Sequence, residues 1–227
     1  MLRVLSLMTL VLVSCSTTPP VQVPLDRGVF ASSERALYEL NLHTGEATLQ
    51  GFFDVGPVQD IALLKDTGEL YGVTLNGLYR IDPGTAETVR VDVEGFVPVN
   101  SLTQTLSGDL LAARGRNVFR ISLDRLVMQK VTTLQTQKSV SGDLIQHQGR
   151  MLVTLGAPEE DDTLAVIRPG GQVTELGSTG FRDVSGLTEV EGQLYGVTRL
   201  GEWISLDPVT GKGQWIHDVP FPGSGLQ

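Results

Sequence analysis

The stretch that decides the fold is "LYGVTLNGLYRIDPGTAETVRVDV", residues 70–93. It contains three short segments in which apolar and polar residues alternate, the pattern of half-buried strands. Asn76-Gly77 separates the first two segments and predicts a two-residue hairpin turn. "DPGT" separates the second segment from the third and is typical of a turn. The stretch therefore predicts three consecutive antiparallel strands.

The same pattern recurs along the chain. A turn glycine followed by an apolar pair recurs at intervals of 40, 41 and 43 residues, at Gly68, Gly108, Gly149 and Gly192. Four antiparallel strands in each unit of about 41 residues are typical of a β-propeller blade. Four complete blades are predicted, over residues 58–93, 99–134, 140–177 and 184–218.

A fifth blade is predicted to be split between the two ends of the sequence. "GVFAS", "ALYELNL" and "EATLQG" supply its second, third and fourth strands, and "GSGLQ" at 223–227 supplies its first. Pairing these segments would remove two exposed strand edges, which otherwise promote aggregation. We therefore predict an all-β fold, a single five-bladed propeller over residues 28–227. A β-sandwich with irregular strand spacing is the alternative.

Composition limits the classes of partner. The chain has 227 residues, of which 41% are apolar, enough for one domain with a full core. Its net charge of −9 argues against nucleic acid, whose binding depends on Lys and Arg neutralising phosphates. The acidic residues are spread along the sequence, which favours solubility, and we expect a monomer.

The N-terminal segment predicts where in the cell the protein is located. Arg3 precedes an apolar run over residues 4–13, which is too short for a membrane span and fits a signal peptide. The run ends in "LVSC", residues 12–15, which resembles the lipobox of bacterial lipoproteins. The resemblance implies cleavage after residues 1–14 and acylation of Cys15, by palmitate among other chains. An ordinary secretory peptide with a chance cysteine is the alternative.

Residues 15–27 are then the lipidated cysteine and a flexible tether. "PPVQVP" within it favours an extended chain. Because Ser16 rather than Asp follows Cys15, the resemblance implies the outer membrane or cell surface of the bacterial envelope, with the domain facing the periplasm or the exterior. The lipid bilayer is therefore one predicted partner.

The recurring "LYGVT…LYRIDPGT" and "LYGVTRLGEWISLDPVTG" resemble the propeller group that contains NHL-type and gluconolactonase-like proteins. Gluconolactonase-like enzymes hold a divalent cation, usually Ca²⁺, at the channel mouth. The resemblance implies carboxylate and amide ligands, here Asp60, Asn100, Asp143 and Asp183. This sequence departs from that group in having five blades rather than six and no Glu in the inner strand "GSGLQ".

The innermost strand of each blade is expected to line the channel. Aligning the five strand starts brings together Gln59, Asn100, Ser141, Ser185 and Ser224. The following position holds Asp60, Ser101, Gly142, Gly186 and Gly225. Such rings of small polar groups suit a polar ligand or a chain of water molecules. The alternative is that a narrow channel admits only small residues.

Two further features lie on the loops that enter the inner strands. Four phenylalanines recur there and are candidates for a partner-binding rim or for plugs between blades: Phe53, Phe96, Phe181 and Phe221. "GAPEEDD" at 156–162 is an insertion between two strands of the third complete blade. Its four acidic residues fit a solvated tip better than a calcium loop, because they lack the spacing and glycine of such loops.

No catalytic constellation is found. His43 and His147 are expected in turns on the opposite face and His217 on an outermost strand, so no histidine is placed to activate a serine. The sequence therefore predicts a non-catalytic binding module for another envelope protein or a small extracellular ligand, without a cofactor. A metal-dependent lactonase-type hydrolase, with its cation at the channel mouth, is the alternative.

Overall fold

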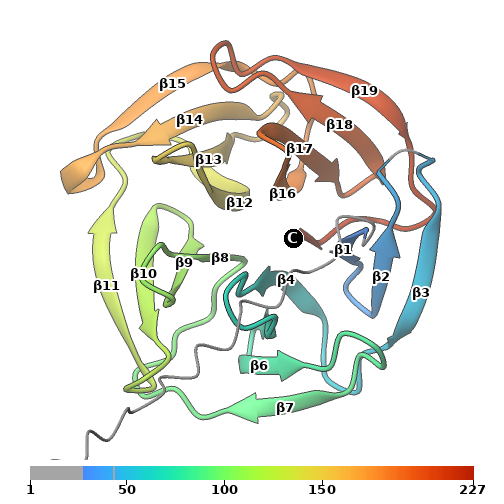
Figure 1. Cartoon of the computed structure of the whole chain (residues 1–227). Helices are drawn as coiled ribbons and strands as arrows, with labels where there is room; N and C mark the ends of the chain where they lie inside the picture. The colour runs from blue at the N-terminus through green and yellow to red at the C-terminus, as the bar shows by residue number, and fades with distance from the viewer. Residues whose placement is uncertain (1–27, 43) are drawn as a thin grey trace, which may run out of the picture.

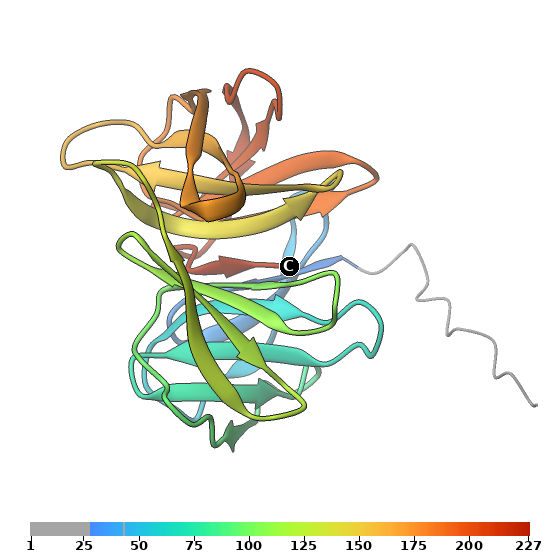
Figure 2. The same ribbon diagram turned by 90° about the vertical axis from the view of Figure 1, so that its left-hand side faces the viewer.

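A computed structural model describes residues 28–42 and 44–227 of the chain. Its strands form five four-stranded antiparallel sheets arranged as blades around a central channel (Figure 1). Viewed from the side, the strands of all blades run between the same two faces of the ring (Figure 2). The predicted all-β, five-bladed propeller is confirmed. Among the residues described, no helix is long and apolar enough to cross a bilayer.

Four blades are continuous in sequence. Blade 1 contains β4 (Val58–Leu63), β5 (Leu70–Thr74), β6 (Gly77–Ile81) and β7 (Thr88–Val91). Blade 2 contains β8 (Ser101–Gln104), β9 (Leu110–Arg114), β10 (Asn117–Ser122) and β11 (Val127–Thr133). Blade 3 contains β12 (Ser139–His147), β13 (Arg150–Gly156), β14 (Thr163–Ile167), the short 3₁₀ turn η1 (Pro169–Gly171) and β15 (Val173–Ser178). Blade 4 contains β16 (Val184–Val190), β17 (Gln193–Thr198), β18 (Glu202–Leu206) and β19 (Gly213–Asp218).

Blade 5 joins the two ends of the chain. It contains β20 (Gly225–Leu226), β1 (Val29–Ser32), β2 (Ala36–Leu40) and β3 (Ala47–Phe52), in that order from the channel outward. Ser32 pairs with Gly225, and Ala31 pairs with Leu226. The backbone N–H of Ser224 also donates to the Ser32 carbonyl at 2.7 Å. The predicted split blade therefore closes the ring.

The apolar core lies in the seams between blades. Each of five buried clusters combines side chains of two neighbouring blades, so the ring has five seams and five clusters. In the seam between blades 4 and 5, for example, the fully buried Trp203 packs in one cluster with Leu40. Burial of one such large apolar side chain contributes about 1.5–3 kcal/mol. Each blade is thus stabilised mainly by its neighbours.

One turn differs from its prediction. The hairpin between β5 and β6 has Leu75 and Asn76 as its two loop residues, because Thr74 pairs directly with Gly77. The predicted Asn76-Gly77 turn is therefore one residue too late. The Thr74 hydroxyl accepts the Asn76 N–H at 3.0 Å and stabilises the turn at the earlier position.

Candidate functional site: the channel and its two mouths

The innermost strands β4, β8, β12, β16 and β20 surround the channel. They run in one direction, because every blade repeats the same strand order. The channel therefore has two different ends. We call them the strand-start mouth, beside Gln59 and Asn100, and the strand-end mouth, beside Gln146 and Gln227.

Two buried aspartates fasten neighbouring inner strands inside the channel. Asp60 on β4 accepts the N–H of Ile61 at 2.8 Å with one carboxylate oxygen and the N–H of Leu102 on β8 at 2.7 Å with the other. Asp143 on β12 does the same with Leu144, at 2.6 Å, and with Leu187 on β16, at 2.7 Å. Each carboxylate therefore links its own blade to the next blade.

The equivalence of these aspartates corrects the predicted alignment of the inner strands. Val58 and Asp60 are two residues apart on β4, but their pairing partners on β5 are adjacent. Val140 and Leu144 are four residues apart on β12, but their pairing partners on β13 are only two residues apart. The bulge in β12 therefore holds one more residue than the bulge in β4. As a result Asp143, and not Gly142, occupies the position equivalent to Asp60.

The two carboxyl groups also interact with each other. Desolvation raises the pKa of Asp60 well above its usual value, and the charge of Asp143 and the hydrogen bond with it raise that pKa further. Desolvation likewise raises the pKa of Asp143, to about 8, against the lowering effect of its hydrogen bonds. Both side chains are fully buried. The pair therefore retains a proton at neutral pH, because two adjacent buried charges are unfavourable.

The small polar residues of the channel make hydrogen bonds both between neighbouring blades and within blade 5. The Ser185 hydroxyl donates to the Gly223 carbonyl at 2.8 Å, and the Ser32 and Ser224 hydroxyls lie 3.0 Å apart. The Ser101 hydroxyl donates to the Gly142 carbonyl. A Cβ atom at Gly225 would lie 2.5 Å from Asp60 Oδ1, so the channel is too tight there for a side chain. These hydrogen-bonded groups and the closing strand β20 occupy the interior of the channel.

At the strand-start mouth the predicted cation ligands do not form a cation site. Asp60 and Asp143 are committed to backbone N–H groups, while Asp183 is exposed on the surface. Asn100 is half-buried and Gln59 donates to the Pro57 carbonyl at 3.3 Å. Within residues 28–42 and 44–227, no group of three or more His, Cys, Asp or Glu side chains is placed to hold a metal ion. These residues therefore do not fit the Ca²⁺ that the family resemblance implies.

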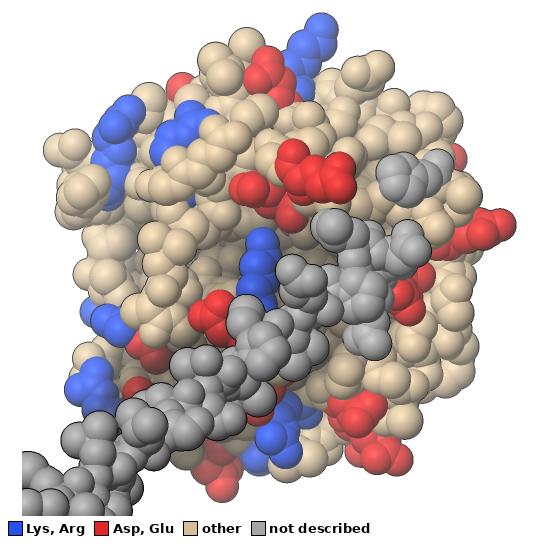
Figure 3. Space-filling view, in the orientation of Figure 1, with Lys and Arg blue, Asp and Glu red and all other residues tan. Residues whose placement is uncertain are grey.

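The strand-end mouth opens into a cavity of about 250 Å³. Its lining comes from blades 1 to 4 and from the end of β20: Leu63, Lys65, Asp66, Thr103, Gln104, Thr105, Leu106, Ile145, Gln146, Thr188, Glu189 and Gln227. Figure 3 shows this face, with a basic side chain at the hollowed centre and acidic side chains around it. Amides and hydroxyls predominate among the polar lining groups, so the cavity suits a small polar ligand. The sequence prediction placed the candidate site at the opposite mouth.

A histidine–glutamate pair lies beside this cavity. His147 is the last residue of β12, and its side chain is fully buried. Its Nδ1 lies 2.6 Å from Oε2 of Glu189 on β16, which lines the cavity. The prediction that His147 lies in a turn is wrong, because β12 continues for nine residues and the turn begins only at Gln148. The length of β12 is set by pairing with β13, which the residue pattern alone did not indicate.

The four rim phenylalanines lie in or against the seams. Phe53 and Phe221 are buried members of two core clusters, and Phe96 and Phe181 pack against two others. Phe221 stacks on Tyr38 with ring centroids 4.0 Å apart. These contacts fit the plug alternative, and their part in binding a partner stays a prediction.

The acidic insertion of blade 3 is anchored at one residue. Asp162 is buried and accepts the Val184 N–H at 2.8 Å, and desolvation raises the pKa of this carboxyl group. Arg182 pairs with the exposed Glu159 at 3.2 Å. The loop therefore combines a buried tie to β16 with a surface ion pair of the kind that contributes little stability.

Comparison with known proteins supports the fold alone. No protein-family model matches the sequence, and no curated protein matches it. Among solved structures, XC5397 from Xanthomonas campestris, described as a gluconolactonase important in glucose secondary metabolic pathways, superposes with a TM-score of 0.57. The two sequences are 13% identical, over 88% of this chain and 80% of that one. The chain is thus similar in fold to a gluconolactonase-like propeller.

Proposed function

We propose that the protein is a non-catalytic binding module of the bacterial envelope, held at the membrane through an acylated Cys15. The observation that carries the proposal is the state of the channel carboxylates. All four oxygens of Asp60 and Asp143 accept backbone N–H groups, and two of these N–H groups belong to the neighbouring blade. Groups committed in this way stabilise the ring and do not offer free ligands to a catalytic cation.

The architecture supports binding. A rigid ring presents loops of several blades on one face, an arrangement on which recognition sites are commonly built. The strand-end mouth offers a concave surface with both polar and apolar lining groups at the centre of such a face. Its ligand is small and extracellular, or belongs to another envelope protein. The size of the cavity suits a small ligand.

The proposed anchor explains how the module is held. Cys15 and twelve further residues precede Gly28, and at about 3.1 Å per residue an extended tether reaches roughly 40 Å. Gly28 lies next to β1, whose Phe30 exchanges hydrogen bonds with Gln227 at the strand-end mouth. Palmitate labelling of the intact protein tests the anchor: wild type incorporates label and Cys15→Ser does not.

A metal-dependent lactonase is the second candidate function, supported by the fold similarity to the Xanthomonas gluconolactonase. Thermal unfolding with Ca²⁺, with EDTA and with neither separates the two proposals. A cation at a hundred times its dissociation constant stabilises the folded state by about 2.7 kcal/mol, a clear shift of the midpoint. We expect the three curves to coincide and lactone substrates to remain intact. A midpoint that EDTA lowers and Ca²⁺ restores, together with lactone hydrolysis, would replace the binding proposal.

A further inference from the structure

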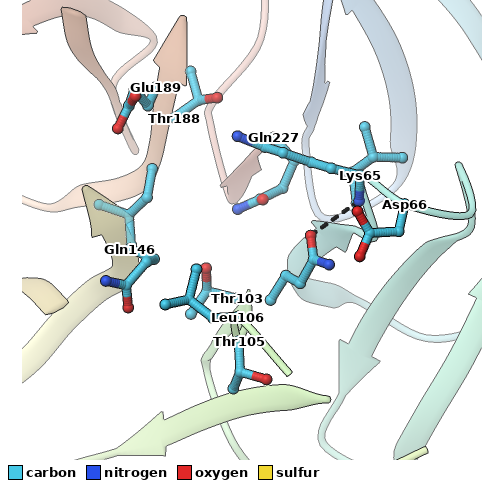
Figure 4. A pocket seen from close by; sticks show the side chains of 12 residues that line it. Lys65, Asp66, Thr103, Thr105, Leu106, Gln146, Thr188, Glu189 and Gln227 are labelled. Carbon is cyan, nitrogen blue, oxygen red and sulfur yellow. Dashed lines mark hydrogen bonds between the residues drawn. The ribbon is translucent and has the colours of Figure 1, made fainter. Parts of the chain in front are cut away.

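Four side chains with hydrogen-bond donors converge on the strand-end cavity from four different blades. Lys65 follows β4, Thr103 lies on β8, Thr188 lies on β16, and Gln227 follows β20. Figure 4 shows the Lys65 side chain extended across the mouth, with the amide of Gln227 directed into the same space. Residues that are far apart in sequence thus meet at one point of the ring.

These donors are available to a ligand. Within the described residues Lys65 makes no ion pair, although its backbone N–H is held by Gln104 Oε1 at 2.9 Å. The Nε2 atom of Gln227 is buried and has no hydrogen-bond partner among residues 28–42 and 44–227. Thr103 and Thr188 are only 3% and 5% exposed, yet both line the cavity. A buried donor without an acceptor is unfavourable, so a ligand oxygen at this point would be stabilised.

In the cavity lining the positive charge of Lys65 lies beside neutral donors, and the carboxylates of Asp66 and Glu189 limit how much negative charge a ligand can carry. An ammonium, an amide N–H and hydroxyls together match an oxyanion. Asp66 and Glu189 line the same cavity, so a doubly charged phosphate would be repelled more strongly than a singly charged carboxylate. Arg side chains, which bind phosphate with two parallel hydrogen bonds, are not part of this lining.

The size of the cavity indicates that the ligand is more than a bare ion. A volume of about 250 Å³ exceeds what one carboxylate group fills. Leu63, Leu106 and Ile145 supply apolar surface beside the donors. We infer that the strand-end mouth binds a small aliphatic organic acid, with its carboxylate toward Lys65 and Gln227 and its carbon chain against Ile145. This inference rests on the proposed function as a binding module.

Isothermal titration of the full-length protein in detergent micelles tests the inference with three probes: butyrate, butyramide and inorganic phosphate. Butyramide keeps the shape of butyrate without its charge. We expect butyrate to bind with a Kd of roughly 1 mM, as suits a ligand of this size, and the other two at least about tenfold more weakly. Lys65→Met should weaken butyrate binding about tenfold and Thr188→Val a few-fold.

Matched controls remove the same groups away from the cavity. Lys130→Met on β11 and Thr48→Val on β3 alter exposed residues and should leave the butyrate Kd unchanged. Equal binding of butyrate and butyramide, tighter binding of phosphate, or equal affinities of the two lysine variants would each overturn the inference, as would the absence of any butyrate binding. Failure of the proposed function is separate, because it would show as cation-dependent lactone hydrolysis whatever the butyrate titration gives.

Discussion

The buried pair Asp60–Asp143 predicts that the protein loses stability as the pH rises through neutrality. The folded state holds these carboxyl groups at raised pKa values, whereas unfolding returns them to ordinary values near 3.8. Above that value the folded chain therefore binds more protons than the unfolded chain. The free energy of unfolding then decreases with rising pH, until the folded pair itself ionises near the pKa of about 8 of Asp143.

The size of the effect follows from one retained proton. Each pH unit between the unfolded and folded pKa values changes the free energy of unfolding by about 1.4 kcal/mol for one group. Between about pH 5.5 and about pH 7.5 each retained proton should therefore cost about 2.7 kcal/mol. This is a large fraction of the stability of an ordinary domain.

The variant Asp60→Asn isolates the contribution of the pair. Its amide cannot ionise, so the variant loses one of the two groups whose ionisation opposes folding, whereas burial still raises the pKa of Asp143. The variant also loses one acceptor for a backbone N–H, which should cost about 1–3 kcal/mol at low pH. We therefore expect Asp60→Asn to be less stable than wild type near pH 5.5 and to approach or exceed it near pH 7.5.

Urea unfolding at several pH values, followed by the fluorescence of the buried Trp203, measures both slopes. Asp54→Asn is the control, because a hydrogen bond from Thr88 lowers the pKa of exposed Asp54 and its titration ends below this pH range. That control should keep the wild-type slope. Parallel pH profiles for wild type and Asp60→Asn would refute the raised pKa of Asp60 inside the channel.

Substitutions at three positions test other parts of the ring. Leu226→Ala removes a fully buried side chain from the closing strand β20 and should lower the free energy of unfolding, measured in urea, by about 2–5 kcal/mol. A loss below about 1 kcal/mol, typical of a surface substitution, would argue against tight closure of the ring. Gly156→Ala places a Cβ 2.7 Å from Asp162 Oδ1 and should cost about 1–3 kcal/mol, seen as a lower thermal midpoint, whereas an unchanged midpoint would mean that the loop relaxes freely. Glu189→Ala leaves buried His147 without its partner and should cost about 1–3 kcal/mol, while Glu189→Gln should cost less; equal losses in the same assay would show that the hydrogen bond contributes nothing.

The sequence was informative about the fold because the blade is a local unit. Each hairpin and each turn, such as the one at Gly68, lies within one repeat, so alternation and spacing predict it directly. Even the split blade followed from counting, because an incomplete repeat at one end matched the missing strand at the other. The observed strand bounds of blade 4, β16 to β19, coincide with the predicted range 184–218.

The channel was harder to predict because it depends on contacts between repeats. One additional residue in the bulge of β12 moves Asp143 into the position of Asp60, and no turn residue signals that insertion. The cavity at the strand-end mouth combines Lys65, Thr188 and Gln227, which share no motif and meet only after the ring has closed. His147 was assigned to a turn for the same reason, since the end of its strand is set by β13.

Closure between β20 and β1 has a consequence for the order of folding. The hydroxyls of Ser32 and Ser224 meet across 192 positions of sequence. Bringing such distant segments together costs about 2.6 kcal/mol more chain entropy than closing a ten-residue loop. Blades 1 to 4 need no such long connection, so they can form progressively during synthesis or export. Blade 5 can form only after β20 is available. The last step of folding is then the pairing of β20 with β1. The rate of this step sets how long an open ring with two unpaired strand edges is accessible to chaperones and proteases.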